Sequence, residues 1–227
     1  MKWSEFFTSS IGKKFIMSLT GIFLITFLVV HVGINACIWA NDGGEMFNLA
    51  SHFMATTVVI RIVEVGLFAG LLLHIIQGLV VEVQNRARRK TGYAVSMGNR
   101  GSKWYSRSMG LLGTLLLFFL VMHLSHFWVP SRFTELPATD IHGREVANQY
   151  GEILRVFQNP VVVILYVLGC LSLMYHLLHG FQSAFRTLGV PNGKYITLIK
   201  TVGVGFAVIV SLAFAMMPVS VYLGWVN

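Results

Sequence analysis

The chain has 227 residues, of which 55% are hydrophobic and 11% are charged, and its mean hydropathy is +0.69. Soluble domains carry about a quarter charged residues, so this composition excludes an ordinary soluble fold. The net charge of +8 does not indicate nucleic-acid binding, because the basic residues flank apolar blocks, where they anchor and orient membrane helices.

Five apolar blocks are long enough to cross a bilayer as helices. The first is too long for the apolar core of a signal peptide and is therefore kept as a helix. Pro130 is predicted to end the third helix, and Asn159 and Pro160 to cap and begin the fourth. We expect an all-α membrane bundle, one domain over 1–227, with helices at about 14–40, 56–85, 107–130, 159–186 and 195–223.

The basic residues predict the orientation of these helices. Thirteen of the 17 Lys and Arg residues lie in the N-terminal segment, in 86–107 and in 186–200. Cytoplasmic segments carry an excess of Lys and Arg, so the N-terminus is predicted to be cytoplasmic and the C-terminus to lie outside.

Four histidines lie inside four different spans, within a weak internal repeat. The first and third spans have a glycine ten positions before a histidine, and the second and fourth have a glycine four positions after one. These pairs are Gly21 and His31, Gly113 and His123, His74 and Gly78, and His176 and Gly180.

The depths of these histidines predict two pairs. At 1.5 Å per residue, His31 and His123 lie roughly 25 Å from the cytoplasmic ends of their helices, and His74 and His176 lie roughly 15–18 Å from theirs. Polar residues inside a membrane are costly and usually functional. Two imidazoles at equal depth can bind iron from both faces of one porphyrin, an arrangement that suits electron transfer. We therefore expect two b-type haems. There is no C-x-x-C-H motif for covalent attachment.

Glycines and further histidines near the four ligand candidates have other predicted roles. Gly78 and Gly180 are expected to leave room for the macrocycles. A lone intramembrane histidine is often a helix–helix hydrogen bond, and this role is predicted for His179, with a His176–His179 metal pair as a minor alternative. His52 and His142 are predicted to be solvated in loops.

Three polar residues are candidates for a quinone site, each with an alternative role. Glu64 either exchanges protons with a quinone or forms a local ion pair with Arg61. Asn35 either bonds a quinone carbonyl or caps a helix, and His126 bonds a quinone, a propionate or a loop. Position alone suggests haem-propionate contacts for Ser18, Thr20, Arg86, Arg89, Trp104 and Arg107.

The ordered motifs resemble a known family. Gly-x9-His, His-x3-Gly, Gly-x9-His and His-x3-Gly-x8-Gly, the last ending at Gly189, resemble the dihaem cytochrome b membrane subunit of succinate:quinone oxidoreductases. That family includes succinate dehydrogenases and fumarate reductases, and the resemblance covers almost the whole chain.

The resemblance implies a membrane anchor in an oxidoreductase complex of the bacterial cytoplasmic membrane. It implies a flavoprotein subunit with FAD and an iron–sulfur subunit on the cytoplasmic face, and electron transfer to or from a quinone, expected to be menaquinone. The chain would contribute the quinone site without being catalytic alone. The family pattern selects His176 rather than His179 as the ligand. Met174 replaces a glutamate that some dihaem fumarate reductases carry, which leaves a proton path through the fourth helix in doubt.

Two other classes fit parts of the pattern. Membrane cytochromes of hydrogenases or formate dehydrogenases also hold haems, whereas cytochrome b of the quinol:cytochrome c class places two ligands on one helix. A transporter could use intramembrane histidines for metal or protons. It would be expected to show broken helices or inverted repeats, whereas the repeat here is parallel.

Overall fold

The computed structural model describes residues 9–88, 103–190, 193 and 195–226. In this part of the chain, five helices are long and apolar enough to cross a membrane, judged by length and composition. The prediction of five such spans is confirmed. They are α2 (Ser10–Ala36) with the 3-10 turn η1 (Cys37–Ala40), α4 (Val58–Arg88), α6 (Met109–His123) with its continuation, α9 (Pro160–Thr187) and α10 (Ile196–Tyr222).

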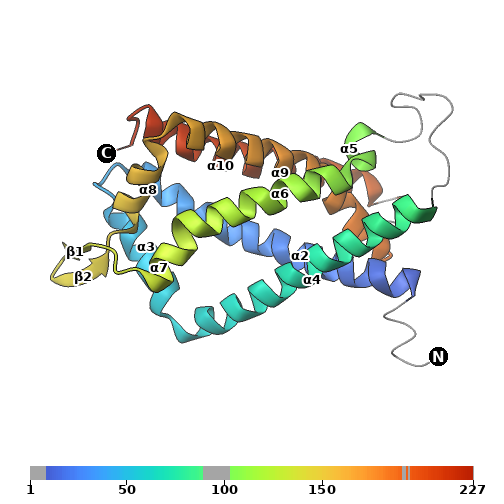
Figure 1. Cartoon of the computed structure of the whole chain (residues 1–227), viewed down its shortest axis with the longest axis horizontal. Helices are drawn as coiled ribbons and strands as arrows, with labels where there is room; N and C mark the ends of the chain where they lie inside the picture. Colours follow the sequence, from blue (N-terminus) through green and yellow to red (C-terminus); the bar gives the residue numbers. More distant parts are fainter. Residues whose placement is uncertain (1–8, 89–102, 191–192, 194, 227) are drawn as a thin grey trace.

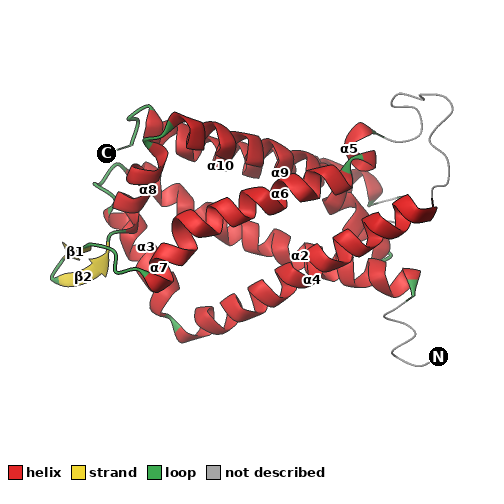
Figure 2. Ribbon diagram, in the orientation of Figure 1, coloured by secondary structure: helices red, strands yellow, loops and turns green. Residues whose placement is uncertain are grey.

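The long helices lie side by side and give the molecule two distinct ends (Figure 1). At one end, here called the α5 end, lies the short helix α5 (Trp104–Arg107), close to where α6 begins. The opposite end, here called the hairpin end, carries the two strands and the short helices α3 (Glu45–Thr56), α7 (Val129–Phe133) and α8 (Gln149–Phe157) (Figure 2). The predicted cytoplasmic side corresponds to the α5 end.

Side-chain caps fix the starts of two long helices. The Ser9 hydroxyl accepts the Gly12 N–H at 3.0 Å, so α2 begins four residues before the predicted position. Asn159 caps α9 by accepting the Val161 N–H at 2.9 Å, with proline in the first turn, as predicted from the two residues. The second helix runs over Val58–Arg88 rather than 56–85.

The prediction that Pro130 ends the third helix is wrong. After α6 the chain forms a π-helical turn, η2 (Leu124–Trp128), and then α7 (Val129–Phe133), which contains Pro130 in its first turn. Proline is tolerated there because the missing N–H costs no hydrogen bond in a first helical turn. The chain therefore stays helical for three residues past the proline.

The hairpin end contains elements that were predicted as loops. They are α3 (Glu45–Thr56), β1 (Ala138–Ile141), β2 (Arg144–Ala147) and α8 (Gln149–Phe157). The strands pair antiparallel, with Ile141 opposite Arg144, and the two-residue turn has positive φ at His142 and Gly143, typical of hairpins. His142 is an exposed turn residue, whereas His52 lies on α3 rather than in a loop; its side chain is exposed.

A buried asparagine joins α3 to α8. The Asn48 side chain accepts the Tyr150 N–H at 2.8 Å and donates to the Asn148 side chain at 3.2 Å. Asn48 is 3% exposed, and its bond to Tyr150 is buried, whereas its bond to Asn148 is partly buried. Tyr150 packs in the same core as Ile38 and Phe157. Its pKa is raised, mainly by burial and to a lesser extent by the nearby Asp42 carboxylate. Together these contacts hold α3 against α8 at the hairpin end of the bundle.

The surface of α4 is apolar along most of its length. No residue of α4 is fully buried, although the helix contains many large apolar side chains. Those exposed in the isolated chain are Val58, Val59, Ile62, Val63, Val65, Leu72, Leu73, Ile76, Leu79 and Val83. Such a surface is unfavourable in water and suits the hydrocarbon core of a bilayer.

Candidate haem sites

Two of the predicted ligands meet toward the hairpin end. His31 on α2 and His123 at the end of α6 have ring centres 5.8 Å apart, with the rings nearly perpendicular. Phe27 stacks on His31, and Phe119 stacks on His123. These aromatic neighbours limit the access of water to both imidazoles. We call these two histidines the hairpin-end pair.

The other two predicted ligands meet nearer the α5 end. His74 on α4 and His176 on α9 have ring centres 6.2 Å apart, and we call them the α5-end pair. The Thr20 hydroxyl of α2 lies 3.1 Å from His74 Nδ1. Thr20 was predicted as a propionate contact from its position; sequence reasoning did not foresee its contact with a histidine on another helix.

The two pairs lie at clearly different levels. Thr20, which contacts the α5-end pair, and His31 are eleven residues apart on α2, a rise of about 16 Å. Tyr166, whose ring centre lies 6.0 Å from that of His123, and His176 are ten residues apart on α9, a rise of about 15 Å. The two helices give the same separation, so the pairing by depth that the sequence predicts corresponds to proximity in the fold.

The spacing within each pair fits coordination of one metal ion between two imidazoles. A histidine nitrogen lies about 2 Å from a bound first-row metal, and the ring centre about 1.1 Å behind it, so opposed ligands have ring centres about 6 Å apart. Among the described residues, no group of three or more His, Cys, Asp or Glu side chains could hold a metal ion. Each pair can therefore offer two ligands, and a porphyrin would supply the rest.

Two glycines fit a flat macrocycle beside the α5-end pair. A Cβ added at Gly78 would lie 3.7 Å from Met17 Cε, and one at Gly180 would lie 4.0 Å from His176 Cδ2. Contacts between the described residues therefore do not require glycine at either position, whereas an adjacent macrocycle would.

With this geometry established, the chain can be compared with known proteins. The chain resembles the succinate dehydrogenase cytochrome b558 subunit of Bacillus subtilis (strain 168). The two are 26% identical over 194 residues, which cover 82% of this chain and 85% of that protein. No protein-family model matches the sequence, and no solved structure matches it.

This similarity confirms the resemblance inferred from the histidine and glycine spacings. The relative's name denotes a cytochrome b, and a cytochrome b holds haem. The matched length covers most of both proteins, so the likeness is to a whole membrane subunit rather than to a single motif.

Two of the quinone candidates lie beside the hairpin-end pair. His126 Nδ1 lies 3.1 Å from the Tyr166 hydroxyl, and Tyr166 also contacts the His123 ring. The Asn35 amide nitrogen donates to the His31 carbonyl oxygen at 2.8 Å and lies 3.4 Å from His31 Nδ1. Asn35 therefore bonds back within its own helix, next to a predicted ligand.

Glu64, the third candidate, makes more contacts than the predicted ion pair. Its carboxylate accepts from Arg61 Nη1 at 2.5 Å, from Trp128 Nε1 at 2.7 Å and from Arg132 Nη2 at 3.1 Å. Arg61 was foreseen because it lies one helical turn away. Trp128 and Arg132 were not, because the π turn in η2 sets the direction of the side chains that follow it.

The predicted propionate contacts are spread over the α5 end. Ser18 is buried and donates to the Lys14 carbonyl oxygen at 2.9 Å, and Arg86 pairs with Glu82 at 2.6 Å. The Trp104 ring centre lies 4.7 Å from that of Tyr175, the residue before His176. Arg89 lies outside the described residues. Of these candidates, Thr20 contacts a predicted ligand directly, whereas Trp104 contacts the residue beside one.

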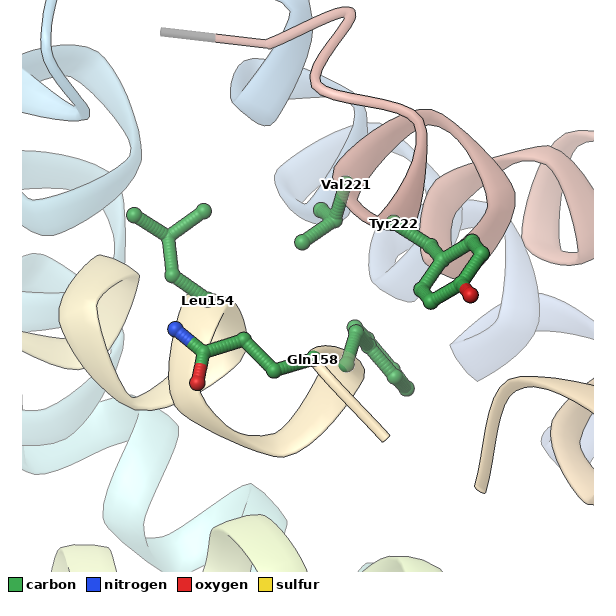
Figure 3. A pocket seen from close by; sticks show the side chains of 5 residues that line it. Leu154, Gln158, Val221 and Tyr222 are labelled. Atoms are coloured by element: carbon green, nitrogen blue, oxygen red, sulfur yellow. The ribbon is translucent and has the colours of Figure 1, made fainter. Parts of the chain in front are cut away.

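A separate cavity of about 290 Å³ lies at the hairpin end, between α8 and the last turn of α10 (Figure 3). Its lining combines apolar side chains with Gln158 and Tyr222. None of the three quinone candidates lines it. Phe157, which does, also contacts the Tyr166 ring, so the cavity adjoins the aromatic residues around the hairpin-end pair.

Proposed function

We propose that the chain is the dihaem cytochrome b membrane subunit of a succinate:quinone oxidoreductase. The observation that carries this proposal is the meeting of four histidines from four helices as two pairs, at two levels about 15–16 Å apart by helix rise. The likeness to a succinate dehydrogenase cytochrome b558 subunit supports the same assignment.

The four histidines are the residues that would bind the haem irons. His31 and His123 would hold the haem toward the hairpin end, and His74 and His176 the haem toward the α5 end. When bound, such haems supply one-electron carriers at two depths of the membrane. The chain's own residues hold the imidazoles on facing helices, and aromatic side chains such as Phe27 and Phe119 shield the hairpin-end pair from water.

The proposed orientation places the α5 end in the cytoplasm. The helix ends and connections there hold most of the Lys and Arg residues, which favour the cytoplasmic side. A flavoprotein with FAD and an iron–sulfur subunit would bind this end, and the α5-end pair would be the nearer one to them. The chain would be a single domain of the bacterial cytoplasmic membrane, without catalytic activity on its own.

The proposed quinone site lies at the hairpin end, with menaquinone as the expected quinone. Reduction of a quinone takes two electrons and two protons, so its site needs both an electron donor and exchangeable polar groups. His126, hydrogen-bonded to Tyr166, is the candidate closest to the hairpin-end pair. Asn35 lies beside His31. Glu64 already accepts hydrogen bonds from three residues, so its use by a quinone would require exchanging one of these partners.

Haem analysis of the purified complex tests this proposal. Wild-type protein should contain two b haems per chain, and replacing any one of the four histidines by alanine should remove one of them. His52→Ala is the matched control, because His52 is exposed on α3, and both haems should remain. A wild-type protein without a Soret band would refute the proposal and favour a transporter.

A further inference from the structure

We propose that Thr20 is a positioning residue for His74: its hydroxyl oxygen accepts a hydrogen bond from Nδ1–H and thereby leaves Nε2 free to bind iron. This inference rests on the proposed function, because it concerns how one of the four proposed ligands is held. It assigns to Thr20 a role different from the propionate contact that its position in the sequence suggests.

The hydrogen bonds of Thr20 determine its role toward His74. A hydroxyl has one hydrogen to donate and two lone pairs that accept. Thr20 Oγ1 lies 2.8 Å from the Ile16 carbonyl oxygen, an acceptor one turn back on α2, and 3.1 Å from His74 Nδ1. With its hydrogen on Ile16, the oxygen can only accept from His74. The imidazole must then carry its proton on Nδ1.

The contact between α2 and the His74 ring extends to the next residue. A Cβ placed on Gly21 would lie 3.6 Å from His74 Cε1, which is ordinary van der Waals contact. Thr20 and Gly21 therefore face the Nδ1 and Cε1 edge of the ring. Nδ1 and Nε2 are both bonded to Cε1, but their in-plane bonding directions diverge, so a hydrogen bond from Nδ1 to Thr20 leaves Nε2 available for coordination.

The other three proposed ligands have different surroundings at Nδ1. Within the described residues, the buried Nδ1 atoms of His123 and His176 have no hydrogen-bond partner. His31 Nδ1 lies 3.4 Å from the Asn35 amide nitrogen, which is a donor and cannot accept a proton. That nitrogen is placed by its shorter bond to the His31 carbonyl oxygen. Among the four proposed ligands, and within the described residues, His74 is thus the one whose Nδ1 lies within hydrogen-bond distance of an acceptor.

A hydrogen bond at the outer nitrogen changes a metal-bound imidazole. It fixes the tautomer and ring orientation and makes the ligand more basic. A more basic ligand favours ferric over ferrous iron, and hydrogen bonding around the ligands is one of the factors by which proteins set haem potentials. Removal of the Thr20 hydroxyl should therefore raise the midpoint potential of the haem held by His74 and leave the other haem unaffected.

Redox titration of the purified complex tests this inference with four variants. Thr20→Val removes the hydroxyl at nearly constant volume, and Thr20→Ser restores it. Thr26→Val is the matched control, because Thr26 lies on the exposed side of the same helix and bonds back to the Ile22 carbonyl oxygen. His74→Ala identifies the haem concerned, since its signal should be absent from that variant.

Thr20→Val should shift one midpoint potential upward by about 59 mV, which corresponds to a tenfold change in the one-electron equilibrium. Thr20→Ser and Thr26→Val should leave both potentials unchanged. If Thr20→Val keeps two haems with unchanged midpoint potentials, the inference about Thr20 is refuted but the proposed function is not. A wild-type protein without haem would refute both. If Thr20→Val loses a haem, the result for Thr20→Ser decides. Two haems in Thr20→Ser support the role of the hydroxyl, and loss of a haem in Thr20→Ser as well refutes it.

Discussion

Replacement of Glu64 by glutamine is expected to weaken the attachment of α4 to the segment that follows His123. The carboxylate bridges Arg61 on α4, Trp128 at the end of η2 and Arg132 on α7. The side chain is 18% exposed, so water can replace these partners only in part. Glutamine retains one acceptor oxygen but loses the charge that attracts both arginines.

The expected loss in the free energy of unfolding follows from how exposed each partner of Glu64 is. Arg61 is 44% exposed, and exposed ion pairs contribute about 0–1 kcal/mol, so this pair counts little. Arg132 is 20% exposed, and hydrogen bonds to charged groups contribute about 1.5–3 kcal/mol. Since glutamine can keep one neutral bond, we expect a net loss of about 2 kcal/mol. For a chain of this length that corresponds to a decrease in Tm of about 4–8 °C.

Thermal unfolding of the purified protein in detergent, followed by circular dichroism, measures this loss. Glu45→Gln is the control, because the Glu45–His142 pair is 42% and 77% exposed, and its Tm should stay within about 2 °C of wild type. An unchanged Tm for Glu64→Gln would refute the reasoning. Quinone turnover measured well below the transitions separates the two roles: lost turnover with intact haem spectra supports a quinone contact, and unchanged turnover supports a purely structural bridge.

Three further substitutions test the packing around the sites. Asn48→Ala should lower the free energy of unfolding by about 2–3 kcal/mol, measured by denaturant titration, because it leaves the buried Tyr150 N–H without its acceptor. Tyr150→Phe should be neutral or stabilising by up to about 1 kcal/mol in the same assay, because the buried hydroxyl has no hydrogen-bond partner among the described residues; a loss comparable to that of Asn48→Ala would contradict this. Gly169→Ala should alter the absorption spectrum of the haem that we propose His123 binds, because a methyl there would collide with the Phe119 ring that stacks on that histidine. Gly205→Ala, with open space around it, should leave the spectrum unchanged.

The long helices and the pairing of histidines could be predicted because both depend on position along a helix. Hydropathy marks the spans, and a constant rise of about 1.5 Å per residue converts sequence position into depth. Pairing by depth agrees with the ring distances of 5.8 and 6.2 Å. The same reasoning gives no information on which side chains of neighbouring helices face each other.

The features that were missed depend on packing between elements. The contact of Thr20 with His74 joins residues 54 positions apart, and no local pattern distinguishes it from other helical threonines. The bridge from Glu64 to Arg132 joins residues 68 positions apart on different helices. The helices at the hairpin end are short and partly polar, and the Asn48 side chain that joins two of them looks like an ordinary loop residue in the sequence.

The central claim is that each haem is shared between two particular histidines, and haem counting in double variants tests this most directly. Changing both members of one pair, His31 and His123, to alanine should leave one haem per chain, as either single change does. Changing one member of each pair, His31 and His74, should leave none. Loss of both haems in the first variant, or one remaining haem in the second, would contradict the pairing.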